Sequence, residues 1–461
     1  MLLSPPYLKD YMRNARCDFV SLSGTQWFPI LLGYLGAFLE GKGCNIKLID
    51  APAYNLSFRE TENIYLDYKP DFLIVYPGDK SKESDIEFTD FLVAKYGAPA
   101  IFVGPYYSMD SFYFLKKSKR VSHGVEGEFE YPVWEWIQGK SLEEINNLVF
   151  KRDGSVIRND SRLYLSQSEL DSIPFVSNFF HRHLNFKYYR TASEPHPFLD
   201  IMTGRGCGWG LCTFCLWVHT YIKERTYNKR SIGNVMEELE FVEKNMKFVR
   251  SVMIQDDTFP KERIIEFCSE KLKRNIKIRW SCYVRADLDF ETLQLMKKAG
   301  CLNLHVGFES ANNEVLKKIK KGLTKERMTK FALEAKKAGL RIHGDFLIGL
   351  PGDSEENIKD LINWACSIRP YTAQFQIFIP FRGTPIYKEL KQQGFLNNNR
   401  INYPYLTNEK IEYLSKFAYR KFYLSLPYIL EVLKHPVNLF FKKIRTIKKA
   451  LSTVLWSKGL L

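Results

Sequence analysis

The sequence has no long low-complexity tract and no heptad repeat, which argues against a disordered chain or a coiled coil. One uncharged stretch, residues 19–39, has the length of a membrane span, but Ser, Thr, Gln and Pro residues interrupt it. We expect a loop and a buried helix there. No secretory signal is recognised, so we expect the nine cysteines to be reduced and the protein to be cytoplasmic. With 461 residues, 45% of them hydrophobic, the chain has enough apolar side chains for two cores.

Three cysteines lie close together and lack an obvious fourth partner. Cys207, Cys212 and Cys215 fall within nine residues of a Gly-rich loop that follows the apolar run 198–202. Three thiolates from one loop can hold three irons of a [4Fe–4S] cluster and leave the fourth iron open, whereas a structural zinc takes four closed ligands. The alternatives are zinc with His219 as fourth ligand, although zinc ligand pairs usually lie further apart, and a disulfide, which a reducing compartment disfavours. The pattern favours the cluster.

After residue 197 the chain alternates short apolar segments with helical segments six times. The expected strands cover residues 198–203, 249–254, 276–283, 302–308, 341–348 and 372–380. Repeated strand–helix units predict a parallel sheet, and six of them predict a partial barrel that is open on one side. Catalytic residues in such barrels lie at the carboxyl ends of the strands. Polar or Gly-rich residues follow every one of these strands, so we expect a single site there.

The Cys loop with an aromatic residue before its last Cys, Asp256 to Phe259, the turn Gly307 to Ser310 and the turn Gly349 to Gly352 together resemble the radical S-adenosylmethionine (SAM) enzymes. More narrowly, they resemble the cobalamin-binding branch that includes the anaerobic magnesium-protoporphyrin IX monomethyl ester oxidative cyclase. The resemblance covers residues 1 to about 390. This chain has four residues between its first two cysteines where the family usually has three. We expect the glycines of the loop to absorb the extra residue as a bulge.

The resemblance implies that SAM chelates the open iron of the cluster. The residues implied in SAM binding are Phe214, Asp256, Asp257, Arg285, Glu309 and Gly349. Asp256 or Asp257 would accept hydrogen bonds from the amine, Glu309 would accept the ribose hydroxyls, and Arg285 would meet the carboxylate. Phe214 and the turn at Gly349 would border the adenine. The alternatives are helix N-caps for the two aspartates, a surface ion pair for Arg285 and core packing for Phe214.

The first 150 residues predict a second α/β unit. Expected strands at residues 2–3, 46–50, 71–76, 99–103 and 120–122 alternate with helices at 29–41, 58–68 and 84–96. This order predicts a doubly wound, flavodoxin-like parallel sheet with a ligand crevice at its carboxyl edge. A nucleotide-binding domain would also have glycines in the turns at that edge.

In the same branch of enzymes this unit binds cobalamin (B12). The residues that the resemblance implies in cobalamin contact are Trp27, Asp50, Gly78, Gly104, Gly127 and Glu128. Trp27 ends a loop, residues 9–26, that is long enough to close over one face of the corrin, although packing beside a helix is its alternative role. The sequence lacks an Asp-x-His-x-x-Gly motif, so we expect no axial His ligand from that motif.

We therefore predict four segments: a cobalamin-binding domain (1–150), an interdomain linker (151–196), a radical SAM core (197–390) and a mainly helical, basic C-terminal extension (391–461). The net charge is +15, and residues 433–461 contain seven Lys or Arg and no Asp or Glu. Apolar residues recur there at helical spacing, which predicts a peripheral helix on an anionic membrane or, alternatively, a helix docked on the barrel. We expect no nucleic-acid binding, because no recognised binding fold accompanies the charge.

The implied activity is reductive cleavage of SAM to a 5′-deoxyadenosyl radical, which abstracts hydrogen from an unactivated carbon of a hydrophobic substrate. Reduced flavodoxin or ferredoxin is the implied electron donor. Cobalamin would donate a methyl group or serve an oxidative cyclisation or rearrangement, and no residue separates these outcomes. Two other readings stay open, which are a non-catalytic cobalamin sensor and a radical SAM enzyme that no longer uses cobalamin.

Overall fold

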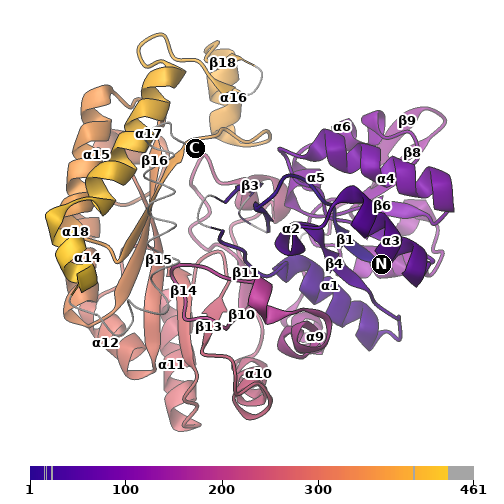
Figure 1. Cartoon of the computed structure of the whole chain (residues 1–461), viewed down its shortest axis with the longest axis horizontal. Coiled ribbons are helices and arrows are strands. Elements are labelled where there is room, and N and C mark those ends of the chain that lie inside the picture. Colours follow the sequence, from indigo (N-terminus) through magenta and orange to yellow (C-terminus); the bar gives the residue numbers. More distant parts are fainter. Residues whose placement is uncertain (15, 17, 22–23, 163, 398–399, 434–461) are drawn as a thin grey trace.

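In a computed structural model, two α/β units lie side by side and their facing edges are joined by loops from both (Figure 1). The structure describes residues 1–433 except 15, 17, 22, 23, 163, 398 and 399. The predicted basic helix of the tail lies outside the described residues, apart from the start of the segment at Leu433.

The first unit contains a sheet in the order β4-β1-β5-β6-β7-β8-β9. Its strands are β1 (Leu2–Ser4), β4 (Leu48–Asp50), β5 (Leu73–Val75), β6 (Ala100–Phe102), β7 (His123–Val125), β8 (Leu148–Arg152) and β9 (Ser155–Arg158). The first five are parallel and follow the flavodoxin-like order 2-1-3-4-5, so the doubly wound prediction is confirmed. The helices are α1 (Ile30–Gly41), α2 (Ala51–Tyr54), α3 (Phe58–Tyr68), α4 (Lys82–Tyr96), α5 (Pro105–Met109), α6 (Ser111–Lys117) and α7 (Glu130–Ile137).

Two details of this unit differ from the sequence-based expectation. The fifth parallel strand begins at His123, whereas we expected it at residues 120–122. The expected domain boundary at residue 150 falls inside β8, which forms an antiparallel hairpin with β9. Asp153 and Gly154 both have positive φ, 49° and 77°, which is the geometry of a two-residue hairpin turn. The start of the expected linker therefore belongs to the first sheet.

The rest of the interdomain segment is packed against the first unit. It forms α8 (Gln167–Ser172) and α9 (Val176–His183) and then a short turn at Phe186–Tyr188. Helix α9 lies on α1, where a Cβ atom on Gly33 would lie 2.3 Å from the Phe180 ring and one on Gly36 would lie 2.2 Å from the Phe179 ring. Glycine at these two positions permits the close approach of the two helices.

The second unit is a six-stranded sheet in sequential order, and all of its neighbouring strands are parallel. Its strands are β10 (Phe198–Ile201), β13 (Ser251–Ile254), β14 (Arg279–Val284), β15 (Cys301–Glu309), β16 (Arg341–Ile348) and β17 (Thr372–Ile377). Its helices are α10 (Ile232–Asn245), α11 (Lys261–Lys273), α12 (Phe290–Lys298), α13 (Asn313–Lys318), α14 (Lys325–Lys337) and α15 (Glu355–Ile368). The predicted partial barrel is confirmed, with its first strand at one edge and its last strand at the other.

A mainly helical segment follows the barrel, as predicted. It contains α16 (Pro385–Gln392), a small hairpin of β18 (Leu396–Asn397) and β19 (Arg400–Ile401), α17 (Asn408–Tyr423) and α18 (Leu426–Leu433). The hydroxyls of Tyr419 and Tyr423 accept hydrogen bonds from the backbone N–H groups of Phe375 and Ala373. These contacts cover the last strand of the barrel, whose outer edge would otherwise be unpaired.

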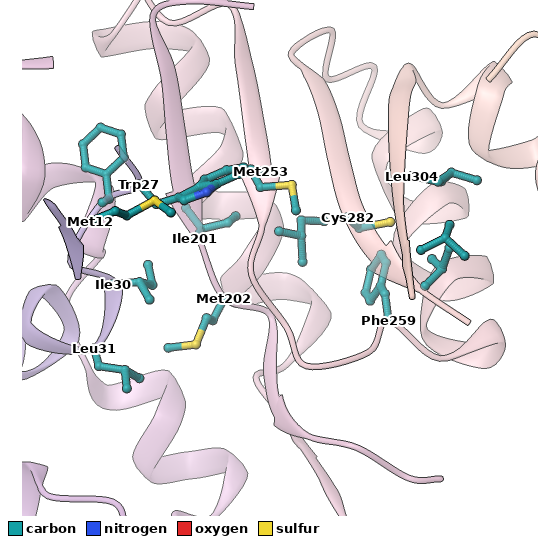
Figure 2. Packing of buried hydrophobic residues seen from close by; sticks show 14 of the residues in the cluster. Met12, Trp27, Ile30, Leu31, Ile201, Met202, Met253, Phe259, Cys282 and Leu304 are labelled. Carbon is teal, nitrogen blue, oxygen red and sulfur yellow. The ribbon is translucent and has the colours of Figure 1, made fainter. Parts of the chain in front are cut away.

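One continuous apolar core joins the two units. Met12, Trp27 and Ile30 from the first unit belong to the same buried cluster as Met202 and Met253 from the barrel (Figure 2). Burial of this interface fixes the two sheets relative to each other. Within the described residues, no helix combines the length and the apolarity that a membrane crossing needs.

Candidate cluster and cofactor site

The Cys loop starts and ends on a short antiparallel pair of strands. Strand β11 (Gly204–Gly206) leads into the loop and pairs with β12 (Tyr227–Lys229), which follows it. Cys207, Cys212 and Cys215 are all half-buried and form no disulfide. Gly206 and Gly210 adopt φ values of 94° and 57°, in the left-handed region that glycine tolerates best. Of these two glycines, Gly210 lies between Cys207 and Cys212, and the expected bulge stays a prediction.

The three thiols stay candidate ligands of the predicted cluster. Among the described residues no three His, Cys, Asp or Glu side chains converge on one point. In a cube-shaped cluster each thiolate binds a different iron, so the thiolates surround the cluster and need not converge. The alternative zinc ligand, His219, has its Nε2 atom 3.0 Å from the carbonyl oxygen of Cys212. Burial raises the pKa of Cys215 to about 12, so iron binding there must displace a proton.

The two predicted aspartates at the end of β13 have different surroundings. Asp256 is buried, and its carboxylate accepts hydrogen bonds from the Thr203 N–H at 2.7 Å, the Thr203 hydroxyl at 2.6 Å and the Tyr227 hydroxyl at 2.6 Å. Asp257 accepts one from the Gly206 N–H at 2.7 Å. Neither caps a helix, because α11 begins after Pro260, so that alternative is wrong. Asp256 ties β12 to β13, and Asp257 holds the last residue of β11, directly before Cys207.

Glu309 lies at the end of β15 in a strained backbone conformation. Its φ is 63°, which is uncommon for a residue other than glycine, and a register shift interrupts the pairing with β16 there. Its Oε1 atom lies 2.9 Å from the Nζ atom of Lys321, a buried cation. Positive charge therefore fixes the carboxylate at the barrel mouth. No motif in the sequence pointed to Lys321.

Arg285 contacts the Cys loop directly. Its guanidinium lies 4.4 Å from the ring centre of Trp209, and Nη2 donates a hydrogen bond to the Lys321 carbonyl at 3.1 Å. Nε also lies 3.2 Å from the carboxylate of Asp287, so the alternative surface ion pair is present as well. The structure thus places Arg285 between the Cys loop and the segment that carries Lys321.

The two residues predicted beside the adenine lie on different turns. Gly349 has a φ of 88°, and its N–H donates a hydrogen bond to the Asp353 carboxylate at 3.0 Å. Asp353 also accepts the Leu350 N–H at 2.9 Å, so it holds the turn after β16. Phe214 is half-buried and packs against the apolar core, which agrees with the core-packing alternative and leaves part of the ring exposed.

Four of the residues predicted to contact cobalamin follow strands at one edge of the first sheet. Asp50 ends β4, Gly78 follows β5, Gly104 follows β6 and Gly127 follows β7. Asp50 accepts a hydrogen bond from the Tyr189 hydroxyl at 3.2 Å, and burial raises its pKa to about 7. A Cβ atom on Gly78 would lie 2.3 Å from Asp18, and one on Gly104 would lie 2.6 Å from the Tyr76 ring. Both positions therefore need glycine.

The turn after β7 faces the Cys loop. Glu128 and Glu130 accept hydrogen bonds from the Arg205 guanidinium at 2.8 Å and 2.6 Å, and all three side chains are buried. A Cβ atom on Gly127 would lie 3.0 Å from the carbonyl oxygen of Tyr221. Arg205 comes two residues before Cys207, so these ion pairs join the carboxyl edge of the first sheet to the start of the Cys loop.

The topological switch point of the first sheet lies between the ends of β1 and β5. Ser4, Arg13, Leu31 and Tyr76 line a narrow gap there that is too small to hold a water molecule. The Tyr76 hydroxyl has no hydrogen-bond partner among the described residues. Ligands of doubly wound sheets bind outside the strand ends at this point.

Trp27 lies on the barrel side of the interface. Its ring makes edge contacts with Phe198 and His305, at centroid distances of 5.3 Å and 5.8 Å. The structure does not place it beside Gly78 and Gly104 at the sheet edge. Its role as a cover for the corrin stays a prediction.

Arg16 is a site residue that the sequence reading missed. It lies between β2 (Tyr11–Arg13) and β3 (Asp18–Val20) and reaches the barrel mouth. Its Nη1 atom donates to Asp257 at 3.0 Å, its Nη2 atom donates to the Gln255 carbonyl at 2.7 Å, and the guanidinium lies 4.7 Å from the Tyr283 ring centre. No local motif predicts this contact between segments 239 residues apart.

Comparison with known proteins agrees with this geometry. Residues 201–365 match the model of the radical SAM superfamily. The chain therefore carries a radical SAM domain and is an enzyme of the radical SAM type, as the sequence indicated.

The likeness extends beyond that domain. An uncharacterised methyltransferase of Pyrococcus horikoshii is 28% identical over 87% of this chain and 89% of its own length. The anaerobic magnesium-protoporphyrin IX monomethyl ester cyclase of Rubrivivax gelatinosus is 21% identical over 79% of this chain and 66% of its own length. The solved structure of the cobalamin-dependent SAM radical enzyme OxsB, with aqua-cobalamin and SAM bound, superimposes with a TM-score of 0.68 over 94% of this chain and 73% of OxsB at 16% identity. These likenesses confirm the predicted branch and the two-unit fold.

Proposed function

We propose that this chain is a cobalamin-dependent radical SAM methyltransferase. The observation that carries the proposal is the contact between the two carboxyl edges, in which Arg205 joins Glu128 and Glu130 of the first sheet to the Cys loop of the barrel. A cofactor on the first sheet and one on the loop would then share a single space between the units. Such an arrangement serves a reaction in which both cofactors act on one substrate, whereas a non-catalytic cobalamin sensor needs no Cys loop.

The residues of the chain have separate tasks in this proposal. Cys207, Cys212 and Cys215 would hold a [4Fe–4S] cluster, and Asp257 and Glu309 would orient SAM at the barrel mouth. The sheet-edge residues Asp50, Gly78, Gly104, Gly127 and Glu128 would hold cobalamin, and Trp27, on the barrel side of the interface, is the predicted cover of the corrin. When bound, the cluster and SAM would supply a 5′-deoxyadenosyl radical and cobalamin would supply a methyl group.

Methyl transfer is favoured over cyclisation by the extent of the two likenesses. The relative named as a methyltransferase shares more identity with this chain and is covered over more of its length than the cyclase is. Reduced flavodoxin or ferredoxin would be the electron donor, in line with the need of radical SAM enzymes for a reductant.

The products formed from SAM show whether a methyl group is transferred, the radical is formed, or both. Methyl transfer from SAM leaves S-adenosylhomocysteine, whereas cleavage to the radical leaves 5′-deoxyadenosine and methionine. The full chain, loaded anaerobically with iron, sulfide and hydroxocobalamin and supplied with reductant, should form S-adenosylhomocysteine, and omission of cobalamin should stop this. Formation of 5′-deoxyadenosine alone, unaffected by cobalamin, would favour an enzyme that has lost the second cofactor.

Cobalamin ligation gives an independent test, because the sequence lacks the Asp-x-His-x-x-Gly motif. The paramagnetic resonance spectrum of cob(II)alamin in the holoenzyme should show no superhyperfine splitting from a histidine nitrogen of the protein. A clear histidine signal would contradict this mode of binding.

The C-terminal end is proposed to touch an anionic membrane from the cytoplasmic side. Helix α18 and the two residues before it carry exposed apolar side chains. Between 40% and 67% of the surface is exposed in Leu424, Leu426, Ile429 and Leu430. The basic segment 434–461, outside the described residues, continues directly from this helix. Exposed leucines followed by lysines and arginines are typical of a peripheral membrane helix.

A further inference from the structure

The Cys loop lies against a basic segment of the barrel. Residues 317–321, Lys-Lys-Ile-Lys-Lys, end helix α13 and lead into the next turn. The backbone N–H of Thr213 donates a hydrogen bond to the carbonyl oxygen of Ile319 at 3.0 Å. The indole N–H of Trp209 donates one to the carbonyl oxygen of Lys320 at 3.0 Å. Both donors belong to the Cys loop, so the basic segment is fixed directly beside the candidate cluster ligands.

Cations from two other segments border the same loop. Arg225 lies between the Cys loop and β12, and a Cβ atom on Gly210 would lie 2.4 Å from its Cγ atom. The guanidinium of Arg285 lies 4.4 Å from the ring centre of Trp209. The loop that carries the three thiols is therefore flanked by positive charge from three separate parts of the chain.

Part of this charge has no counter-ion. Lys318 lies 3.6 Å from the carboxylate of Glu389. Lys317, Lys320 and Arg225 are exposed, and within the part of the chain that the structure describes no ion pair involves them. Lysines in the last turn of α13 favour the helix dipole, but Lys320 and Arg225 lie outside that helix. An excess of positive charge beside the Cys loop therefore faces solvent.

Apolar side chains are exposed among these cations. Leu211, directly before Cys212, is 36% exposed, and the Trp209 side chain is partly exposed. A Cβ atom on Gly322 would lie 2.0 Å from the Trp209 ring, so the ring rests on the backbone of the turn after the basic segment. Apolar and aromatic side chains within a charged rim are typical of a surface that binds another protein. The loop patch consists of Trp209, Leu211, Arg225, Lys317, Lys318 and Lys320.

The charge and the position of the loop patch define its partner. A second copy of this chain has a net charge of +15, and residues 433–461 carry seven Lys or Arg and no acidic residue, so both would be repelled. An acidic partner is attracted instead. The patch also lies over the three candidate ligands of a redox cluster, and this position serves a partner that delivers an electron. An acidic electron-carrier protein meets both conditions.

We propose that the loop patch is the docking surface for an acidic electron-carrier protein that reduces the cluster. The proposal rests on the proposed function, which needs a reduced cluster, and it adds where the carrier binds and by which charges. In the encounter the carrier is oxidised by one electron and the cluster is reduced by one electron, and no proton is transferred. Interfaces of electron carriers are small and short-lived, so attraction between opposite charges controls the rate of encounter.

The first test measures binding. The full-length protein loaded with its cluster is titrated at low ionic strength with oxidised bacterial flavodoxin of net negative charge, and binding is followed by calorimetry. In the double variant Lys317→Glu/Lys320→Glu the affinity should fall by about tenfold or more. The matched control is Lys273→Glu/Lys330→Glu, which changes the net charge equally on α11 and α14, where the two side chains are 77% and 76% exposed. It should bind within about twofold of the unaltered protein.

The second test measures electron transfer. Flavodoxin hydroquinone is mixed anaerobically with the cluster-loaded protein, and its oxidation is followed by the absorbance of the flavin semiquinone. With the unaltered protein the rate should fall as salt is added, because screening weakens the attraction. With Lys317→Glu/Lys320→Glu the rate at low salt should be about tenfold lower and should lose this decline with salt. Photoreduced 5-deazariboflavin, a small uncharged reductant, should reduce the cluster at the same rate in all variants.

A milder variant keeps the test decisive where charge reversal impairs folding. Lys317→Gln/Lys320→Gln removes the two charges without reversing them, and it should lower both the affinity and the rate by about threefold. Equal flavodoxin binding by the variants of the patch and by the control variant would overturn the proposal. Equal slowing with 5-deazariboflavin would also overturn it, because the lysines would then act on the cluster itself and not on docking.

Other occupants of the loop patch give different results. If a short RNA duplex or anionic liposomes bind through Lys317 and Lys320 while reduction by flavodoxin is unaffected, the patch is a polyanion site and the proposal is wrong. Binding of flavodoxin does not need a reducible cluster, so the two proposals fail separately. Absence of iron after reconstitution would contradict the proposed function even where flavodoxin binds as expected. Formation of S-adenosylhomocysteine together with unchanged flavodoxin binding in the patch variants would overturn only the docking surface.

Discussion

Asp256 and Asp257 are neighbours in the sequence, but they have different structural roles. Asp256 satisfies three donors inside the protein, whereas the side chain of Asp257 is 11% exposed and pairs with Arg16 from the other unit. Of these two adjacent carboxylates, Asp256 supports the loop and Asp257 makes contacts at the barrel mouth.

This division predicts different effects of two alanine substitutions. Asp256→Ala leaves three buried donors without an acceptor and should destabilise the protein by about 3 kcal/mol or more. Asp257→Ala should cost less stability and should weaken SAM binding to the cluster-loaded protein. Thermal melts and equilibrium SAM binding measure the two effects, and an equal loss of stability in both variants would contradict the assignment.

Glu194 lies before the barrel, is buried, and accepts hydrogen bonds from the hydroxyls of Ser251 and Ser281. It predicts a pH dependence of stability. Its pKa is raised to about 8 in the folded protein, so the folded state holds a proton that the unfolded chain releases above its ordinary pKa. Stability therefore falls as pH rises towards 8, by up to about 1.4 kcal/mol per pH unit from this group. Glu194→Gln lacks the ionisation, so its stability relative to the unaltered protein should increase between pH 5.5 and 7.5. A constant difference in denaturation midpoint across this range would show that Glu194 does not hold the proton.

The sequence predicted residues whose signal is local and missed those whose contacts are distant. The thiols of the Cys loop, Glu309 at its strand end and the glycines of the turns stand in recognisable patterns. Arg16 and Glu194 enter the barrel from segments before it, and Lys321 follows a short helix without a motif. Only the tertiary fold brings these three side chains to the site.

At the scale of elements, β11 connects the two units through one side chain. Arg205 is 4% exposed and forms buried ion pairs with Glu128 and Glu130, whose side chains are 4% and 1% exposed. Removal of one partner from a buried ion pair leaves an uncompensated charge and costs about 3–5 kcal/mol.

Arg205→Met should therefore lower the melting temperature strongly and reduce the iron retained by the adjacent Cys loop. Arg158→Met is a matched control, because Arg158 pairs with Glu126 but is 48% exposed, and it should change stability by less than about 1 kcal/mol. Iron content and melts of the two variants, measured after the same reconstitution, check this expectation. Equal behaviour of the two variants would mean that the buried pairs do not position the loop.

Periodicity predicted most elements because alternating apolar strands and amphipathic helices leave a clear pattern. The six barrel strands and the first four strands of the other sheet lie within a few residues of their expected positions. The hairpin β8–β9 was missed because Asp153-Gly154 reads equally as a linker turn, and β9 is largely exposed and so carries little apolar signal.

At the scale of the whole molecule, one apolar core and several ion pairs make the two units a single assembly. Arg382 pairs with Asp110, and Lys223 lies 2.8 Å from Glu126, in addition to the pairs of Arg205 and Arg16. The site is built from both units, so neither unit alone contains all of its residues.

The C-terminal tail is expected to bind the whole protein to anionic membrane surfaces. Each basic residue near an anionic surface contributes about 1 kcal/mol, so the seven in residues 433–461 should support measurable binding. Truncation after Leu433 should release the protein from anionic liposomes in a co-sedimentation assay, with SAM cleavage largely retained. If the tail instead docks on the barrel, truncation should lower the melting temperature and leave co-sedimentation unchanged.

Reductive SAM cleavage should depend on the three thiols of the Cys loop. Iron content and 5′-deoxyadenosine formation are compared, under reducing anaerobic conditions, between the unaltered chain and a variant with Cys207, Cys212 and Cys215 all replaced by Ala. The unaltered chain should bind close to four irons and cleave SAM, and the variant should do neither while its N-terminal unit still takes up cobalamin. A full complement of iron, or continued SAM cleavage, in the triple variant would contradict the account.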